Sequence, residues 1–206
     1  PRPFHEGPDV TERLLSVDEI RELSRDLRIL LATNGTLTRI LNVVADEEIV
    51  VHIVDQRVHH IAPKVPDLQE LPLGRVLQRN IVLKGRSTGK PFVAAESLIA
   101  IDLLPPELMT SLTTTDCPIG EAMAASCLET FKEAPTVWVG ELPTWLEDGY
   151  RDSHAGTVGR RYRIIAAGQP VIVITEYFLQ NCIDEYAATV LDRRPHSNGK
   201  SGRSSG

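Results

Sequence analysis

The sequence predicts an α+β protein in which an antiparallel β-sheet is covered by helices. Two observations lead to this fold class. Strand-like segments occur in pairs that short turns connect, at 75–104 and again at 160–179. Helical patterns come before and between these pairs, whereas a protein built from βαβ units would alternate single strands with helices. We therefore expect the consecutive hairpins to form one antiparallel sheet.

The first elements in the chain are helical. The segment SVDE at 16–19 has the form of a capping box, and apolar residues follow it at helical spacing. We predict a helix from 18 to 32, which the Asn-Gly pair at 34–35 ends. Residues 36–45 are either a second short helix or the entrance to a strand.

The elements that follow are mainly strands. Residues 47–58 carry apolar side chains on both faces, which is typical of a central strand. Turns at 85–89 and 167–169 each join two strands into a hairpin. Between the hairpins lie two short helices, near 105–113 and 118–126, and a strand at 136–142.

Length and composition bound the domain organisation. The chain has 206 residues, of which 42% are apolar and 24% are charged, and these values are ordinary for a globular protein with one core. Both ends are rich in Pro, Gly and Ser and have no apolar period. We predict a flexible N-terminal segment at 1–15, a single domain at 16–192 and a disordered C-terminal tail at 193–206.

Charge and cysteine usage restrict the partners. The net charge of −6 disfavours nucleic acid and anionic membranes, so an anionic ligand would need local positive charge. Cys117, Cys127 and Cys182 lack a paired spacing. No apolar run approaches the roughly 18 residues of a membrane span, and no signal-peptide pattern is present. We expect a cytoplasmic monomer or weak dimer that binds neither nucleic acid nor membrane.

Two charged residues stand on apolar strand faces. Because residues two apart share a face, Glu176 lies with Ile and Phe side chains, and Arg79 lies with Leu and Ile side chains. Each buried charge needs a partner. The two residues either pair with each other or with backbone groups, or they line a cavity in which Arg79 grips a ligand carboxylate and Glu176 faces a hydroxyl. The pattern alone leaves both interpretations open.

No metal or cofactor motif is evident. His59 and His60 are adjacent in an extended segment and point to opposite faces, which disfavours a shared metal. No G-x-S-x-G or cysteine-histidine signature is present, and Gly85 and Gly89 belong to a turn rather than to a dinucleotide motif. We expect an activity that uses neither metal nor cofactor.

The block GRRYRIIAAGQPVIVITEYFL at 159–179 resembles the C-terminal hairpin of the chorismate pyruvate-lyase family, with its G-R-R-x-R, G-x-P and T-E-x-F-L motifs. NGTLTRIL at 34–41, VLQRNIVLKG at 76–85 and CPIGEAM at 117–123 follow the family's order, so the resemblance covers about 18–180. It implies a chorismate lyase-like fold and the cofactor-free conversion of chorismate to 4-hydroxybenzoate and pyruvate. The most similar members supply 4-hydroxybenzoate to actinobacterial secondary metabolism.

The resemblance also implies site residues. Arg79, in L-Q-R-x-I, would hold the carboxylate of the product, and Glu176 would contact its hydroxyl. The backbone of Ile119 would help to fix the carboxylate, and the side chain of Leu37 would cover the ring. We accordingly expect Arg79 and Glu176 to be catalytic and all four residues to bind substrate and product.

Several features of this site stay open in the sequence. Glu96 stands where some family members carry an arginine, and it would add negative charge if it faced the site. Glu176 is expected to have a raised pKa and to donate a proton or hydrogen bond, unless the hydrogen moves within the substrate itself. Arg160, Arg161 and Arg163 form either a solvated edge or an additional positive field.

A buried pocket for chorismate would need an entrance. The helical segments near 32–42 and 105–126 are each interrupted by Gly or Pro, which makes them candidate lids. If these lids close over the product, its release limits turnover.

The main alternative is a non-catalytic sensor of small anions. Effector domains of a class of bacterial transcription regulators share the lyase-type fold and bind small anions with arginine and glutamate. Those regulators carry an upstream helix-turn-helix domain, whereas about 17 residues precede the first predicted helix here, which favours the enzyme.

Overall fold

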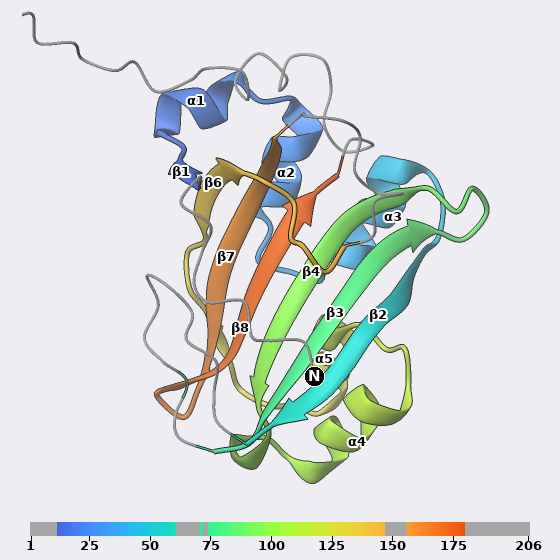
Figure 1. The fold of residues 1–206 in the computed structure, drawn as a ribbon, viewed down its shortest axis with the longest axis vertical. Coiled ribbons are helices and arrows are strands. Elements are labelled where there is room, and N and C mark those ends of the chain that lie inside the picture. Colours follow the sequence, from blue (N-terminus) through green and yellow to red (C-terminus); the bar gives the residue numbers. More distant parts are fainter. Residues whose placement is uncertain (1–11, 61–70, 72–73, 147–155, 180–206) are drawn as a thin grey trace, which may run out of the picture.

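The computed structural model describes residues 12–60, 71, 74–146 and 156–179. In this part of the chain, eight strands form one antiparallel sheet and helices pack on one of its faces, which confirms the predicted α+β class (Figure 1). The predicted tail at 193–206 and Cys182 lie outside the described residues. No helix in the described ranges is long and apolar enough to cross a membrane.

The strands are β1 Arg13–Leu14, β2 Ile49–His59, β3 Val76–Gly85, β4 Pro91–Ala100, β5 Phe131–Lys132, β6 Thr136–Gly140, β7 Thr157–Ala166 and β8 Gln169–Phe178. Their order across the sheet is β1-β6-β7-β8-β4-β3-β2, and β5 also pairs with β7. Both predicted hairpins are confirmed, as β3–β4 and β7–β8. The pairing of β8 with β4 joins the two hairpins into one sheet. The turn between β7 and β8 places Ala167 and Gly168 at positive φ, as a two-residue hairpin loop requires.

The structure corrects two predictions about the sheet, the position of β2 and the extent of the flexible N-terminal segment. β2 is an edge strand rather than a central one, because β3 is its sole strand partner in the described residues. Its apolar side chains pack on both faces, with Ile53 against the helix-covered core and Val54 against a smaller cluster on the other face. At the N-terminus, β1 pairs with β6 and Leu15 N donates to Val137 O at 3.0 Å, so residues 13–15, which were predicted to belong to the flexible N-terminal segment, form part of the sheet edge.

The helices are α1 Val17–Glu22, α2 Arg25–Ala32, α3 Leu37–Ala45, α4 Pro106–Thr114 and α5 Ile119–Ala125, and a 3-10 turn spans Ile101–Leu103. The single helix predicted for 18–32 is wrong, because α1 and α2 are separate. Leu23 has extended backbone, and the Ser24 side chain accepts a hydrogen bond from Leu27 N at 3.2 Å, which caps a second helix. The apolar period continues across the break because Leu23 and Leu27 pack in the same cluster.

The helix-covered face of the sheet has two apolar clusters. α2 and α3 pack on one end of the face, and α4 and α5 pack on the other. Strand register aligns two rows of residues between these ends. One row is Arg79, Ser97, Ile174 and Tyr162, and the next is Ile81, Ala95, Glu176 and Arg160. Both charged residues singled out in the sequence therefore lie on the helix-covered face, between its two apolar ends.

On the opposite face, Gly159 makes room for a buried tryptophan. Gly159 pairs across the strands with Trp138, which is 1% exposed, and a Cβ on this glycine would overlap the indole ring. We expect Gly159→Ala to lower the free energy of unfolding by about 1–3 kcal/mol through overpacking, measured by urea unfolding. Gly35→Ala is the control, because the nearest atom to its Cβ would be Thr33 Oγ1 at 3.8 Å. Equal unfolding midpoints for Gly159→Ala and the wild type would contradict this packing.

Candidate active site

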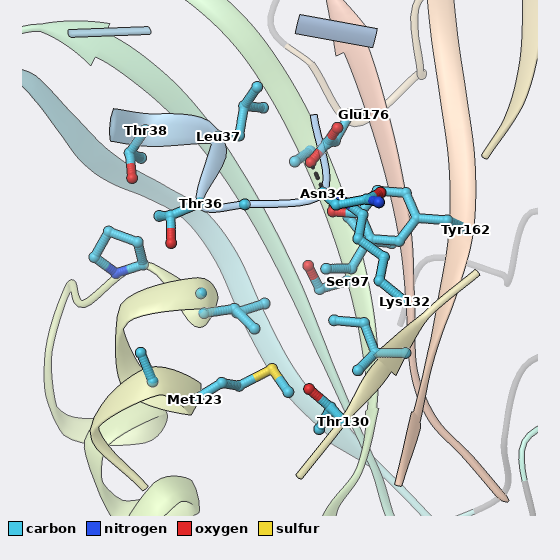
Figure 2. Close-up of a pocket in the computed structure, with 18 of the residues that line it drawn as sticks. Asn34, Thr36, Leu37, Thr38, Ser97, Met123, Thr130, Lys132, Tyr162 and Glu176 are labelled. Carbon is cyan, nitrogen blue, oxygen red and sulfur yellow. Dashed lines mark hydrogen bonds between the residues drawn. The ribbon is translucent and has the colours of Figure 1, made fainter. Parts of the chain in front are cut away.

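A cavity of about 300 Å³ lies between the two apolar ends of the helix-covered face (Figure 2). The sheet forms one side of it. The other sides come from 34–38 at the start of α3, 118–124 in α5 and 128–132 at β5. Among the lining residues that the structure describes, Glu176 and Lys132 carry charge. The cavity is otherwise lined by apolar, hydroxyl and amide groups.

Three of the four predicted site residues line this cavity: Leu37, Ile119 and Glu176. Arg79 is fully buried next to the cavity, directly across from the lining residue Ser97, but it is not itself in the lining. β4 separates the strands of Arg79 and Glu176, which sets their strand axes about 10 Å apart. The sheet therefore brings both residues to one region, and direct contact between Arg79 and a ligand stays a prediction.

Arg79 is held by the segment that precedes α5. Its Nη1 donates to the carbonyl of Cys117 at 3.0 Å, and its Nη2 donates to the carbonyl of Thr115 at 3.3 Å. Its Nε is buried and has no hydrogen-bond partner among the described residues. Burial lowers the pKa of the guanidinium, and the nearby Asp116 carboxylate opposes this shift. Arg79 thus fixes the loop that leads to Ile119 and keeps its Nε–H donor for a further acceptor.

Glu176 is paired with Arg160 rather than with Arg79. Arg160 Nε donates to one carboxylate oxygen. The Tyr162 hydroxyl donates to the other at 3.0 Å (Figure 2). The side chains of Arg160 and Glu176 are 0% and 6% exposed. The carboxylate singled out on an apolar strand face therefore has two donors within the protein. Burial and the neighbouring Glu176 raise the pKa of Tyr162, so this residue stays a hydroxyl donor.

Arg160 also binds the end of a helix. Its Nη1 donates to the carbonyls of Leu30 and Leu31 at 2.6 and 2.9 Å, in the last turn of α2, where carbonyl groups lack helical partners. Burial is the largest single influence and lowers its pKa, but Glu176 and Tyr162 together raise the pKa by more. The solvated edge considered for the arginine cluster is wrong for Arg160.

The other two arginines of the G-R-R-x-R motif lie outside the cavity. Arg161 pairs with Glu12 at 3.2 Å, and Arg163 pairs with Glu133 at 2.6 Å. Both are half-buried, and neither is a lining residue. Among the three arginines, Arg160 is thus the one that donates to a carboxylate lining the cavity, that of Glu176.

Glu96 lies on the opposite face of the sheet, which settles whether it adds charge to the cavity. Its cross-strand neighbours are Asn80 and Thr175, and it accepts a hydrogen bond from Gln78 Nε2 at 2.9 Å. Burial raises its pKa. The departure from some family members at Glu96 therefore places no negative charge in the candidate site.

Lys132 is the site residue that the sequence analysis missed. Its Nζ donates to the carbonyl of Thr33 at 3.1 Å and lies 3.9 Å from the centre of the Tyr162 ring. Burial and the charge of Arg160 lower its pKa to about 8. β5 has two residues, which is too short for a recognisable strand pattern, but its pairing with β7 aims Lys132 into the cavity.

The candidate lids both contribute to the cavity, and they touch each other. Residues 34–38 and 118–124 fall within the segments predicted as lids. A Cβ on Gly120 would lie 3.0 Å from Thr36 Oγ1, so glycine permits a close approach of α5 to the start of α3. Opening of these segments stays a prediction. In the described ranges, no cluster of His, Cys, Asp and Glu has the form of a metal site.

Solved structures define the fold class. The gene product SA0254 of Staphylococcus aureus superimposes with a TM-score of 0.54 at 10% identity, covering 74% of this chain and 92% of that chain. PhnF of Mycobacterium smegmatis gives a TM-score of 0.52 at 11% identity, with 74% and 67% covered. At these identities the likeness concerns the fold alone.

Sequence comparison defines the family. Residues 31–185 match the family described as "Chorismate pyruvate-lyase Rv2949c-like". The chorismate pyruvate-lyase of Mycobacterium leprae is 60% identical over 190 residues, which are 92% of this chain and 90% of the relative. That of Mycobacterium tuberculosis is 54% identical over 193 residues, covering 92% and 97%. The chain belongs to the Rv2949c-like chorismate pyruvate-lyase family.

Proposed function

We infer that the protein is a chorismate pyruvate-lyase, which converts chorismate to 4-hydroxybenzoate and pyruvate. The observation that carries this conclusion is the 60% identity to a relative of that name over 92% of the chain. The family match at 31–185 includes the strands that build the cavity. The sensor alternative is not favoured, since the fold-level matches are 10–11% identical.

The reaction requires a site that orients one substrate. The ether bond between the ring and the enolpyruvyl oxygen breaks, and the ring carbon that bears the hydroxyl loses its hydrogen. The electron pair of that C–H bond completes the aromatic ring, and the enolpyruvyl fragment takes up the hydrogen and leaves as pyruvate. Aromatisation drives the reaction, so the protein contributes mainly orientation, charge stabilisation and exclusion of water.

We propose roles for the four predicted residues. Arg79 and the backbone N–H of Ile119 hold the ring carboxylate, Leu37 covers the ring, and Glu176 accepts a hydrogen bond from the ring hydroxyl. The unpartnered Nε of Arg79 supports the first role, and so does the position of Ile119 as the first residue of α5, where N–H groups lack helical acceptors. The two donors on Glu176 favour its action as an acceptor rather than as an acid.

Incubation of the purified protein with chorismate tests the function. We expect 4-hydroxybenzoate and pyruvate to accumulate in equal amounts. Chromatography measures the 4-hydroxybenzoate, and a coupled enzymatic assay measures the pyruvate. Binding of chorismate without product above the uncatalysed background would instead support the sensor.

Product release is expected to limit turnover, because the two candidate lids meet between Thr36 and Gly120 beside the cavity. Stopped-flow measurement should show a rapid burst of 4-hydroxybenzoate followed by a slower steady rate. A linear early phase would show that chemistry limits the rate.

We also propose that the protein is cytoplasmic, a monomer or weak dimer, and without nucleic-acid or membrane partners. The net charge of −6 supports the last part of this proposal. Size-exclusion chromatography with light scattering tests the oligomeric state.

A further inference from the structure

Lys132 places an ammonium group in the lining of the cavity. It shares the lining with Glu176, and these two are the charged lining residues in the described part of the chain. Figure 2 shows Lys132 beside Tyr162 and Ser97, on the same side of the cavity as Glu176. Its Nζ carries three N–H donors, and one of them donates to the carbonyl of Thr33. An acceptor in the cavity could therefore take another.

Chorismate has a second carboxylate whose position the ring determines. The ring carboxylate and the ring hydroxyl are at opposite ends of the ring, and the enolpyruvyl ether is on the carbon next to the hydroxyl. With the hydroxyl at Glu176, the side-chain carboxylate must therefore lie at the Glu176 end of the cavity. The ring carboxylate would lie at the other end, toward Arg79.

The other described cation at that end, Arg160, does not line the cavity, although its buried Nη2 has no hydrogen-bond partner among the described residues. It is fully buried and donates to Glu176 and to the carbonyls that end α2. Lys132 is half-buried and lines the cavity. It is thus the described cation that a ligand carboxylate can reach at the Glu176 end.

We propose that Lys132 binds the carboxylate of the enolpyruvyl side chain and so makes the site select a dianionic substrate over its monoanionic product. This inference rests on chorismate being the substrate. The product lacks the side chain and loses this contact, which helps the two fragments to leave separately.

The electrostatics around Lys132 make its charge depend on the ligand. The groups that face it are Arg160 and Tyr162 from β7 and Glu176 from β8. Burial and Arg160 disfavour the ammonium, and a ligand carboxylate would restore it. In the free protein the ammonium form is lost as the pH rises through about 8, so affinity for chorismate should fall across that range.

Lys132→Gln removes the charge and keeps a donor for the carbonyl of Thr33. Steady-state kinetics should show a KM for chorismate raised about tenfold to a hundredfold, as expected for loss of a charge-assisted hydrogen bond. Calorimetry should show unchanged affinity for 4-hydroxybenzoate. Lys90→Gln is the matched control, because this lysine is exposed in the β3–β4 turn and its loss changes the net charge equally. Its KM should equal that of the wild type.

Lys132→Arg provides a second test that does not need the neutral variant to fold. Arginine stays charged across the tested range, so the rise in KM above about pH 8 should be present in the wild type and absent in Lys132→Arg. A wild-type KM that is flat from pH 7 to 10 would overturn the proposal, as would an unchanged KM in Lys132→Gln or a parallel loss of affinity for substrate and product. A wild type that does not convert chorismate would overturn the proposed function itself.

Discussion

Arg160→Met should lower the free energy of unfolding by about 3–5 kcal/mol, because it leaves the buried carboxylate of Glu176 without its cation. The pair is almost completely shielded from water, with side chains 0% and 6% exposed. The substitution also removes the donor to the carbonyls that end α2. Urea unfolding followed by circular dichroism measures the loss.

Two further variants test whether the loss of stability comes from the buried ion pair between Arg160 and Glu176. Combining Arg160→Met with Glu176→Leu removes both charges and should recover much of the lost stability, while activity on chorismate stays absent. Arg163→Met breaks a pair whose side chains are 17% and 29% exposed, and we expect a loss of about 1 kcal/mol or less. If Arg160→Met were no more destabilising than Arg163→Met, the buried pair would not have the structural role assigned to it.

Arg79→Met should lower kcat/KM for chorismate at least about a hundredfold, because it removes the proposed anchor of the ring carboxylate. Affinity for 4-hydroxybenzoate should fall as well, since the product keeps that carboxylate. This pattern differs from that of Lys132→Gln, which should spare the product. Steady-state kinetics and calorimetry with both ligands distinguish the two cations.

The fold of Arg79→Met should survive, because methionine fills much of the same volume and Arg79 has no carboxylate partner in the described hydrogen bonds. Arg75→Met is a suitable control, since Arg75 forms a surface pair with Asp102 and its side chain is 55% exposed. We expect that control to keep full activity. An Arg79→Met protein that keeps kcat/KM, or one that unfolds, would assign Arg79 to structure rather than to binding.

Local signals in the sequence were sufficient for the fold class and for part of the site. Alternating apolar residues and glycine-containing turns predicted the β3–β4 and β7–β8 hairpins, and the face count placed Arg79 and Glu176 each on an apolar face of its own strand. Leu37 and Ile119 came from the family resemblance rather than from a pattern, and both line the cavity.

The partner of Glu176 could not be found by counting from the hairpin turn. A bulge between Ile164 and Ile165 shifts the register of β7 against β8 by one residue. Without it, the turn would place Arg160 opposite Thr175, and the guanidinium would point to the other face from Glu176. The bulge therefore sets Arg160 opposite Glu176, which a residue count from the turn does not show.

Other errors have similarly local physical causes. Ser24 begins a new helix inside an unbroken apolar period, so periodicity alone joined α1 to α2. β2 is apolar on both faces because a second cluster covers part of the outer face, although the strand is at the edge of the sheet. Lys132 was missed because the pairing of β5 with β7 determines where its side chain lies, and this contact joins segments far apart in sequence.

The contacts of Arg160 have a consequence for redesign of the pocket. This side chain braces Glu176 from behind, between the sheet and the end of α2, whereas the walls that would touch ring substituents come from 34–38 and 118–124. The shape of the pocket and the placement of the Glu176 carboxylate thus depend on different residues. Smaller side chains at 34–38 and 118–124 would widen the pocket for bulkier aromatic precursors. Arg160 would still hold the Glu176 carboxylate in the same position.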